Sequence, residues 1–241
     1  MTVHPNLQKC QTFIDCHLRA PKSSTTDSPT FRPPTVALSR QTGAGGLSIA
    51  ELLAQKLEHS PLHTDCPWTV FDKNLVSKVL EDHNLPERLA RFMPEDKVSF
   101  LSDALEELFG LHPPSWNLIH QTTETILKLA ELGNVILLGR GANVITAKMK
   151  HVFHVRLVGS LERRCHRVQA RHHLSPEAAA DFIKQEDAGR ERYLKRHFHR
   201  DTNDPLLYHL IVNTDWFSDI DAADLIARAL IAKFVSGSSS P

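Results

Sequence analysis

Short apolar runs alternate with longer amphipathic stretches through the middle of the chain. After the first run, Ile49, Leu53 and Leu57 recur at helical spacing, and a second helical stretch at 119–132 ends before Gly133, a residue type that commonly ends helices. The runs short enough for buried strands occupy residues 35–38, 69–71, 135–138, 152–157 and 207–212. Strands separated by helices predict an α/β fold in which a parallel, doubly wound sheet carries helices on both faces.

This pattern changes at both ends of the chain and once in its interior. Residues 1–34 are rich in Pro, Ser and Thr and predict a disordered leader, although a short helix within residues 6–19 also fits. Residues 233–241 predict a flexible tail. Residues 73–114 have a helical pattern and are too long for a simple crossover, which predicts a helical insertion within a domain of residues 35–232.

Composition gives no global argument for a nucleic-acid or membrane partner. The 28 basic residues balance the 28 acidic ones, no apolar run is long enough to cross a bilayer, and the first residues lack the pattern of a signal peptide. We therefore expect a cytoplasmic protein. Its scattered cysteines form no CxxC pair and are expected to be reduced thiols, and its 15 histidines show no metal-ligand spacing; the cysteines are Cys10, Cys16, Cys66 and Cys165.

A glycine-rich segment lies between the first predicted strand and the first predicted helix. Glycines there let backbone N–H groups turn toward an anion, and the helix N-terminus adds its dipole. The spacing resembles the Walker A phosphate loop, but Arg40 stands at the first glycine position and Gly46 at the lysine position. Taken alone, the segment fits an ordinary strand-to-helix turn equally well. The predicted phosphate-binding and ATP-binding residues are Gln41, Thr42, Gly43, Ala44, Gly45, Gly46, Leu47 and Ser48.

Four segments in a fixed order carry a family resemblance. Residues 37–46 contain Ser-Arg followed by Gly-Ala-Gly-Gly, residues 70–75 a strand that ends in Asp-Lys, residues 135–142 a strand that ends in Gly-Arg, and residues 187–193 an arginine-bearing helix. Together they resemble the cytidylate-kinase-like family over about residues 35–230. The resemblance implies the P-loop nucleoside-monophosphate-kinase fold, with a five-stranded parallel sheet, a helical monophosphate-binding insertion and a lid at about residues 160–205.

The resemblance also implies a reaction, in which ATP with Mg²⁺ is the donor and a nucleoside monophosphate, CMP or dCMP first, is the acceptor. Gly141 stands where cytidylate kinases carry an aspartate that helps to read cytosine. Two alternatives remain open. One is a nucleotide-binding regulator that has lost turnover, because the phosphate-loop lysine is missing, and the other is a kinase for another small acceptor, because of Gly141.

Phosphoryl transfer requires positioned positive charge, which arginine supplies through a planar fork that stays ionised. The predicted catalytic residues are Arg40, Arg140, Arg190 and Arg192, and the predicted acceptor-binding residues are Asp72, Gly139, Arg140 and Asp187. Ser48 is a weak candidate for a Mg²⁺ ligand. Structural roles compete with each: a helix-end ion pair for Arg140, a solvated charged face for Asp187 and the lid arginines, and helix capping for Asp72 and Ser48.

Overall fold

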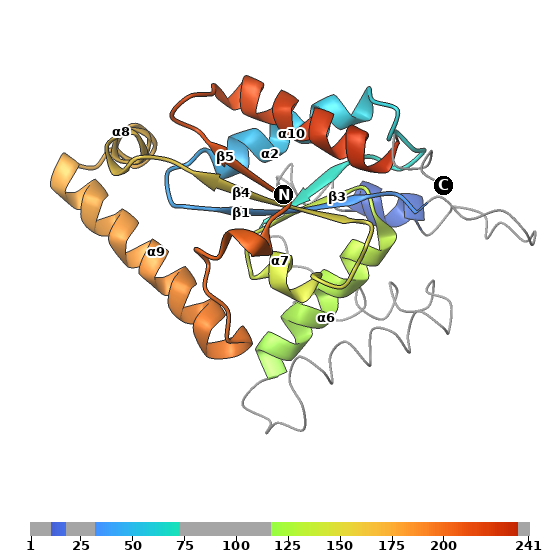
Figure 1. Ribbon diagram of the computed structural model, residues 1–241, viewed down its shortest axis with the longest axis horizontal. Helices are drawn as coiled ribbons and strands as arrows, with labels where there is room; N and C mark the ends of the chain where they lie inside the picture. Colours follow the sequence, from blue (N-terminus) through green and yellow to red (C-terminus); the bar gives the residue numbers. More distant parts are fainter. Residues whose placement is uncertain (1–10, 18–31, 73–116, 236–241) are drawn as a thin grey trace, which may run out of the picture.

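The computed structural model describes residues 11–17, 32–72 and 117–235. Its centre is a five-stranded, all-parallel sheet with the strand order β2-β3-β1-β4-β5 (Figure 1). The strands are β1 (Thr35–Arg40), β2 (Thr69–Phe71), β3 (Val135–Leu138), β4 (Val152–Val158) and β5 (Leu210–Asn213). The predicted fold class is therefore confirmed.

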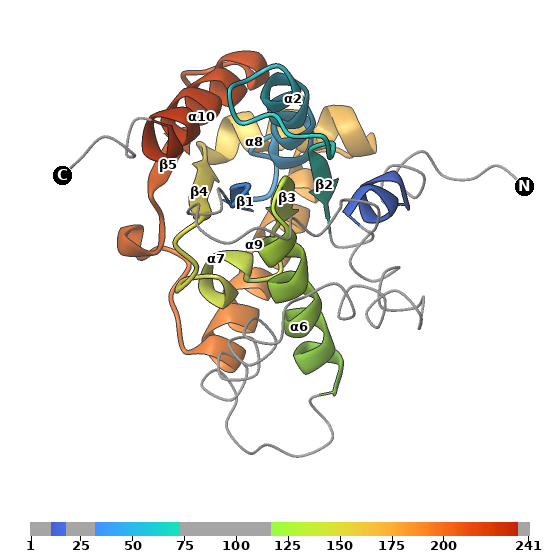
Figure 2. The same cartoon turned by 90° about the vertical axis from the view of Figure 1, so that its right-hand side faces the viewer.

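Helices cover both faces of this sheet. The helices are α2 (Gly46–Glu58), α6 (Asn117–Leu132), α7 (Ala142–Ile145), α8 (Leu161–His172), α9 (Pro176–Phe198) and α10 (Asp219–Phe234), with a 3-10 turn, η2 (Pro205–Leu207). Figures 1 and 2 show α2 and α10 together on one face and α6 and α7 on the other. The long helix α9 runs along the carboxyl ends of the strands on the α6–α7 side.

The central strand explains why the strands read as continuous apolar runs. Val36 and Leu38 on β1 pack with residues of α2 and α10, while Ala37 between them packs with residues of α6 and α7. Because successive side chains of a strand point to opposite faces, a strand covered on both faces must be apolar at every position. The same constraint makes a charged residue inside a central strand conspicuous.

The predicted strands agree with the observed ones, except at the start of the fifth. Residues 205–207 form η2, and β5 begins at Leu210. Pro205 has no N–H to give to a ladder, and the Asp204 carboxylate accepts a hydrogen bond from the Leu206 N–H at 2.9 Å, which closes a turn instead. Residues 233–234, assigned to the flexible tail, are the last turn of α10. The predicted insertion at 73–114 lies outside the described residues.

Part of the predicted disordered leader belongs to the core, which corrects that expectation. Residues 11–17 are helical, and the side chains of Phe13 and Ile14 are 0% and 1% exposed. The Phe13 ring meets Phe71 at the end of β2 edge-on, with ring centroids 5.5 Å apart. Cys16 and Cys66 form a disulfide bond, so the expectation of reduced thiols is wrong for this pair. No helix in the described ranges is both long and apolar enough to span a bilayer.

These contacts predict that the leader stabilises the domain. A full-length Phe13→Ala/Ile14→Ala variant should lose about 3–6 kcal/mol of unfolding free energy, because two fully buried side chains are truncated. A chain that starts at Arg32 should lose at least as much and melt about 6 °C or more below the full chain. Thermal unfolding followed by circular dichroism measures both.

The exposed residue Gln11 lies in the same helical segment, and Gln11→Ala is the matched control. It should melt with the full chain. A truncated chain that melts within about 2 °C of the full chain would contradict the assignment, since one kcal/mol moves the midpoint of a domain this size by about 2–4 °C.

Candidate active site

The loop between β1 and α2 has the backbone of an anion-binding turn. Gly43 and Gly45 have φ angles of 83° and 79°, in the left-handed region that favours glycine. A Cβ atom on Gly43 would lie 2.6 Å from the Arg164 carbonyl oxygen, so α8 packs directly against the loop. No side chain of the described residues caps α2, and its first turn holds no acidic residue. Its first N–H groups are therefore available to a ligand anion.

The Arg40 side chain lies across this loop. A Cβ atom built on Gly46 would lie 2.9 Å from Arg40 Cγ, and one on Gly139 would collide with Arg40 Nη1. Among the described residues, no carboxylate forms an ion pair with Arg40. Burial, together with the nearby charge of Arg190, lowers the pKa of Arg40 to about 10, while Asp72 and two lid carboxylates act in the opposite direction. Arg40 is therefore still charged at neutral pH, and it faces a second cation.

Asp187 of α9 connects the lid to the phosphate loop. Its Oδ1 accepts hydrogen bonds from the Thr42 N–H at 2.8 Å and the Thr42 hydroxyl at 2.6 Å. The same carboxylate pairs with Arg164 Nη1 at 2.7 Å and with Arg190 Nη1 at 3.0 Å. A carboxylate therefore takes one of the loop's backbone donors, which indicates that this part of the loop is shaped for an oxyanion.

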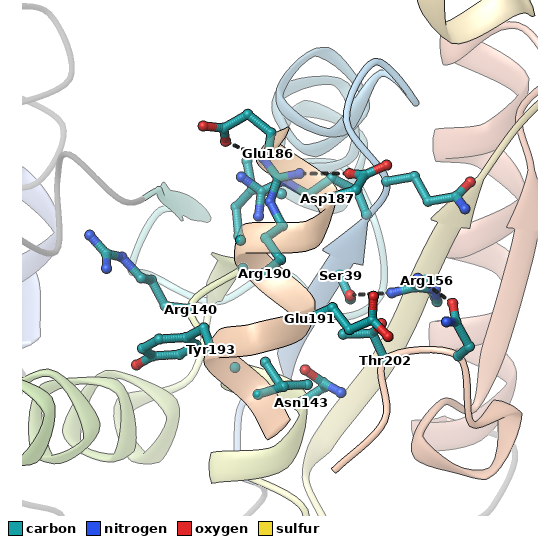
Figure 3. A pocket seen from close by; sticks show the side chains of 18 of the residues that line it. Ser39, Arg140, Asn143, Arg156, Glu186, Asp187, Arg190, Glu191, Tyr193 and Thr202 are labelled. Atoms are coloured by element: carbon teal, nitrogen blue, oxygen red, sulfur yellow. Dashed lines mark hydrogen bonds and ion pairs between the residues drawn. The ribbon is translucent and has the colours of Figure 1, made fainter. Parts of the chain in front are cut away.

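A cavity of about 520 Å³ lies beside the loop, at the carboxyl edge of the sheet and under α9 (Figure 3). Ligands of open α/β sheets bind at this edge. The ends of β1, β3 and β4 line it, and α7, α9 and the segment after α9 complete it. Four arginines are among the lining residues: Arg40, Arg140, Arg156 and Arg190.

Arg140 lies two residues after the end of β3, as the sequence predicts for a residue at a ligand-binding edge. It is held in the left-handed region with a φ angle of 55°, between two glycines. Its Nε atom is buried and has no hydrogen-bond partner in the described structure. Burial raises the pKa of the Tyr193 phenol, and the charge of Arg140 lies close enough to oppose this increase. Arg140 is thus a half-buried cation whose Nε has no acceptor among the described residues.

The remaining predicted site residues divide between this cavity and its surroundings. Gly139 and Asp187 line the cavity, while Arg192 is exposed on α9 and is not among the lining residues. Asp72 ends β2 and is near enough to Arg40 to raise the pKa of that guanidinium. The Ser48 hydroxyl donates to Asp219, which also pairs with Arg167 at 2.6 Å. No cluster of three or more metal-binding side chains occurs in the described residues.

Sequence reasoning missed three residues of the site. In the sequence, Arg164 is one of many charges in a basic stretch. Its ion pair with Asp187 joins α8 to α9 and can be found only from the structure. Asn143 lines the cavity from α7 and carries no pattern that distinguishes it. Arg156 did carry a signal, because it is the charged residue inside the buried strand β4.

The strand order, the glycine loop after β1 and the arginine-bearing helices define a P-loop kinase fold. Residues 35–216 match the cytidylate kinase-like family, and the chain belongs to this family. Membership supports nucleotide-dependent phosphoryl transfer. No curated protein sequence matches the chain significantly.

Several solved structures are similar to the chain, and the first of them supports the fold. An uncharacterised protein from Eubacterium ventriosum is similar at 17% identity and a TM-score of 0.62, over 83% of this chain and 99% of that one. A shikimate kinase from Bacteroides thetaiotaomicron has 16% identity and a TM-score of 0.43, over 82% and 96%. A gluconokinase from Sinorhizobium meliloti has 13% identity and a TM-score of 0.39, over 85% and 93%.

The Asp187 contacts predict opposite effects on stability and on nucleotide binding. Asp187→Asn should lower the unfolding free energy by about 1–3 kcal/mol, because the poorly exposed Arg164 loses its ion pair. It should also tighten ATP binding severalfold, because the neutral amide no longer repels phosphate oxygens and no longer offsets the charges of Arg164 and Arg190. Thermal unfolding and isothermal titration with MgATP measure the two effects.

Glu186→Gln is the matched control. Glu186 is exposed and pairs with Arg190 Nη2 at 3.1 Å, without touching the loop. It should change stability by less than about 0.5 kcal/mol. Weaker ATP binding by Asp187→Asn would mean that the carboxylate orients Arg190 toward phosphate. The expected repulsion between the Asp187 carboxylate and the phosphates would then be wrong.

Proposed function

We propose that the protein is a kinase that transfers the γ-phosphoryl group of ATP to a small acceptor bound in the cavity under α9. The observation that carries this proposal is the position of Arg40. Its side chain covers Gly46, the position of the missing lysine, and it lines the acceptor cavity without an ion-pair partner among the described residues. A cation between a phosphate loop and an acceptor cavity is what the transferring phosphoryl group requires.

The residues present fit a nucleoside triphosphate. Glycines in the left-handed region turn the loop, and the uncapped start of α2 offers N–H donors to the phosphates. Residues 41–46 would hold the β- and γ-phosphates, with Arg40 beside them and Arg190 opposite. The repulsion between Arg40 and Arg190, which contributes to the lowered pKa of Arg40, would be relieved by the negative charge of the phosphates.

The described residues offer little to a Mg²⁺ ion. Leu47 follows Gly46, where a phosphate loop carries a metal-binding hydroxyl, and the Ser48 hydroxyl donates to Asp219. Mg²⁺ keeps several water ligands and binds chiefly through substrate phosphates. We therefore assign the ion to the nucleotide, and the assignment of Ser48 as its ligand stays a weaker proposal.

A nucleoside monophosphate, with CMP or dCMP first, is the acceptor that family membership suggests. Arg140 would bind its phosphate, with Gly139 allowing close approach and Asp72 and Asp187 setting the surrounding charge. Arg190, and Arg192 on a closing lid, would neutralise charge during transfer. The chain's own contribution is to position two phosphates in line and to surround them with fixed donors.

A second candidate is a kinase for another small acceptor, and the packing of Gly141 favours it. Gly141 has a φ angle of 73°, and a Cβ atom there would lie 3.2 Å from the Phe198 ring. The backbone conformation and the close ring both disfavour the aspartate that cytidylate kinases carry at this point. The backbone and the ring at Gly141 therefore support an acceptor that is recognised without this aspartate.

An ATP-consumption screen with Mg²⁺ tests the function. The acceptors are all common nucleoside monophosphates and a panel of small hydroxylated acids and sugar phosphates. Turnover with a nucleoside monophosphate supports the first candidate, and turnover only with another acceptor supports the second. Tight ATP binding with no turnover of any acceptor would favour the regulator, and no ATP binding at millimolar concentration would refute the phosphate-loop assignment.

Arg40 and Gly46 provide a reciprocal test. Arg40→Ala should lower kcat by about 100-fold or more, because a charge at the transferring phosphoryl group is lost. Gly46→Lys alone should also impair the enzyme, because the new side chain meets the Arg40 stem. The Arg40→Gly/Gly46→Lys double variant should recover part of the activity, since it moves the cation to the usual lysine position.

Steady-state kinetics with ATP and the acceptor found in the screen measure these effects, and circular dichroism checks folding. A double variant no better than either single variant would contradict the replacement of lysine by Arg40. Unchanged kcat in Arg40→Ala would do the same.

Arg140 should act on the acceptor side. Arg140→Ala should cost about 2–4 kcal/mol in kcat/KM for the acceptor while the affinity for ATP stays within about twofold, because a fork that binds an oxyanion is removed. Arg140→Lys should recover only part of this loss. Equal losses for ATP and acceptor would instead indicate a donor-side role or a folding defect.

A further inference from the structure

Arg156 is a buried cation without a counterion among the described residues. It lies on β4 opposite Ser39 of β1, and only 7% of it is exposed. Its guanidinium donates to the Ser39 hydroxyl at 3.1 Å, the Tyr208 hydroxyl at 3.2 Å and the Asn203 side-chain oxygen at 3.4 Å. All three acceptors are neutral, and no carboxylate of the described residues forms an ion pair with it. Buried charges are normally paired, so a counterion is missing.

A second, independent observation lies at the same cavity. Asn143 of α7 lines it and is 5% exposed, and its Nδ2 donor has no hydrogen-bond partner in the part of the chain that the structure describes. Buried amide donors rarely remain unsatisfied in native proteins. Figure 3 shows Asn143, Thr202, Ser39 and Arg156 around the same part of the cavity, away from Arg140. A charge without a counterion and a donor without an acceptor both indicate an oxygen-rich, negatively charged group.

The nearest candidate for an internal counterion is Glu191. It lines the cavity from α9, but it is exposed and forms no ion pair with Arg156. The other acidic lining residues, Glu186 and Asp187, are already paired with arginines. Within the described part of the chain, the charge of Arg156 is therefore open to a ligand.

We infer that Arg156 and Asn143, with Ser39, form an oxyanion subsite for a carboxylate or phosphate that the acceptor carries in addition to its phosphorylated group. Ser39 directly precedes Arg40, so this subsite adjoins the phosphate-transfer end of the cavity. The acceptor class that fits is a small hydroxylated acid or phosphate ester rather than a nucleoside monophosphate, whose one anionic group is the phosphoryl acceptor itself. That statement about the acceptor rests on the proposed kinase function, whereas anion binding at Arg156 does not.

Direct binding tests the subsite on the full-length chain without nucleotide. The probes are glycerol, D-glycerate and glycerol 3-phosphate at matched ionic strength, which share a three-carbon skeleton and differ in the anionic group. At least one of the two anions should raise the Tm, and glycerol should not. A larger Tm shift with D-glycerate indicates that the subsite prefers a carboxylate, and a larger shift with glycerol 3-phosphate indicates that it prefers a phosphate. No shift with either anion at tens of millimolar would overturn the inference.

Variants then locate the binding. Arg156→Gln should weaken the affinity for the effective anion about tenfold or more, and Arg156→Lys should weaken it less. Arg228→Gln is the matched control, because Arg228 is exposed on α10 and does not line the cavity. It should bind the anion as the wild type does. Equal anion affinity for Arg156→Gln and wild type would overturn the assignment.

Asn143→Asp separates ligand binding from a structural role of Arg156. This near-isosteric change leaves Arg156 and its neutral acceptors in place and adds a negative charge to the same cavity. Anion binding should be lost while the Tm without ligand is retained or raised. Unchanged anion binding would show that the subsite lies elsewhere. The anion-binding experiments contain no nucleotide, so a negative result with these variants refutes the subsite alone. ATP binding is measured in a separate titration, and its failure refutes the kinase proposal alone.

Discussion

The arrangement of the site depends on one steric constraint: the Arg40 side chain can cross the phosphate loop only where Gly46 and Gly139 lack side chains. A Cβ atom on either glycine would meet the arginine, on its stem at Gly46 and on its guanidinium at Gly139. Glycine at position 46 and arginine at position 40 are therefore sterically coupled. The cation lies at the end of β1 and not in the first turn of α2, and it is still beside the loop.

Charge balance around the loop follows from this placement. Arg40 and Arg190 face each other, and burial makes their repulsion stronger than it would be in water. Asp187 offsets part of that repulsion by pairing with Arg190 and Arg164 while it accepts the Thr42 N–H. The same carboxylate therefore stabilises the ligand-free lid and lies close to where phosphate oxygens would bind. We therefore expect stability without ligand and affinity for nucleotide to be opposed at this residue.

Much of the fold could be predicted from sequence, because buried parallel strands leave an unambiguous apolar pattern. Residues 69–71 and 135–138 form the strands that the pattern indicates, and Arg140 lies at the predicted edge. The leader was misjudged because its composition is polar on average. The average composition of the leader does not reveal that two of its apolar side chains, Phe13 and Ile14, are buried in the core. The Cys16–Cys66 disulfide joins residues 50 positions apart in sequence, a contact that the sequence pattern does not show. Arg192 is grouped with Arg190 through the resemblance of residues 187–193 to an arginine-bearing helix, but it is exposed on α9 and does not line the cavity.

The end of β1 links the donor and acceptor sides of the cavity. Successive side chains of a strand point to opposite faces, so Ser39 faces Arg156 while Arg40 turns toward α2 and the loop. One peptide unit therefore separates the residue that contacts the proposed oxyanion subsite from the cation at the phosphate loop. The ladder to β3 extends through Leu38 and the ladder to β4 through Arg40, so the backbone has little freedom to change that separation. An acceptor bound at Arg156 would consequently be held at a fixed position relative to the phosphates, which is the main requirement that phosphoryl transfer places on a protein.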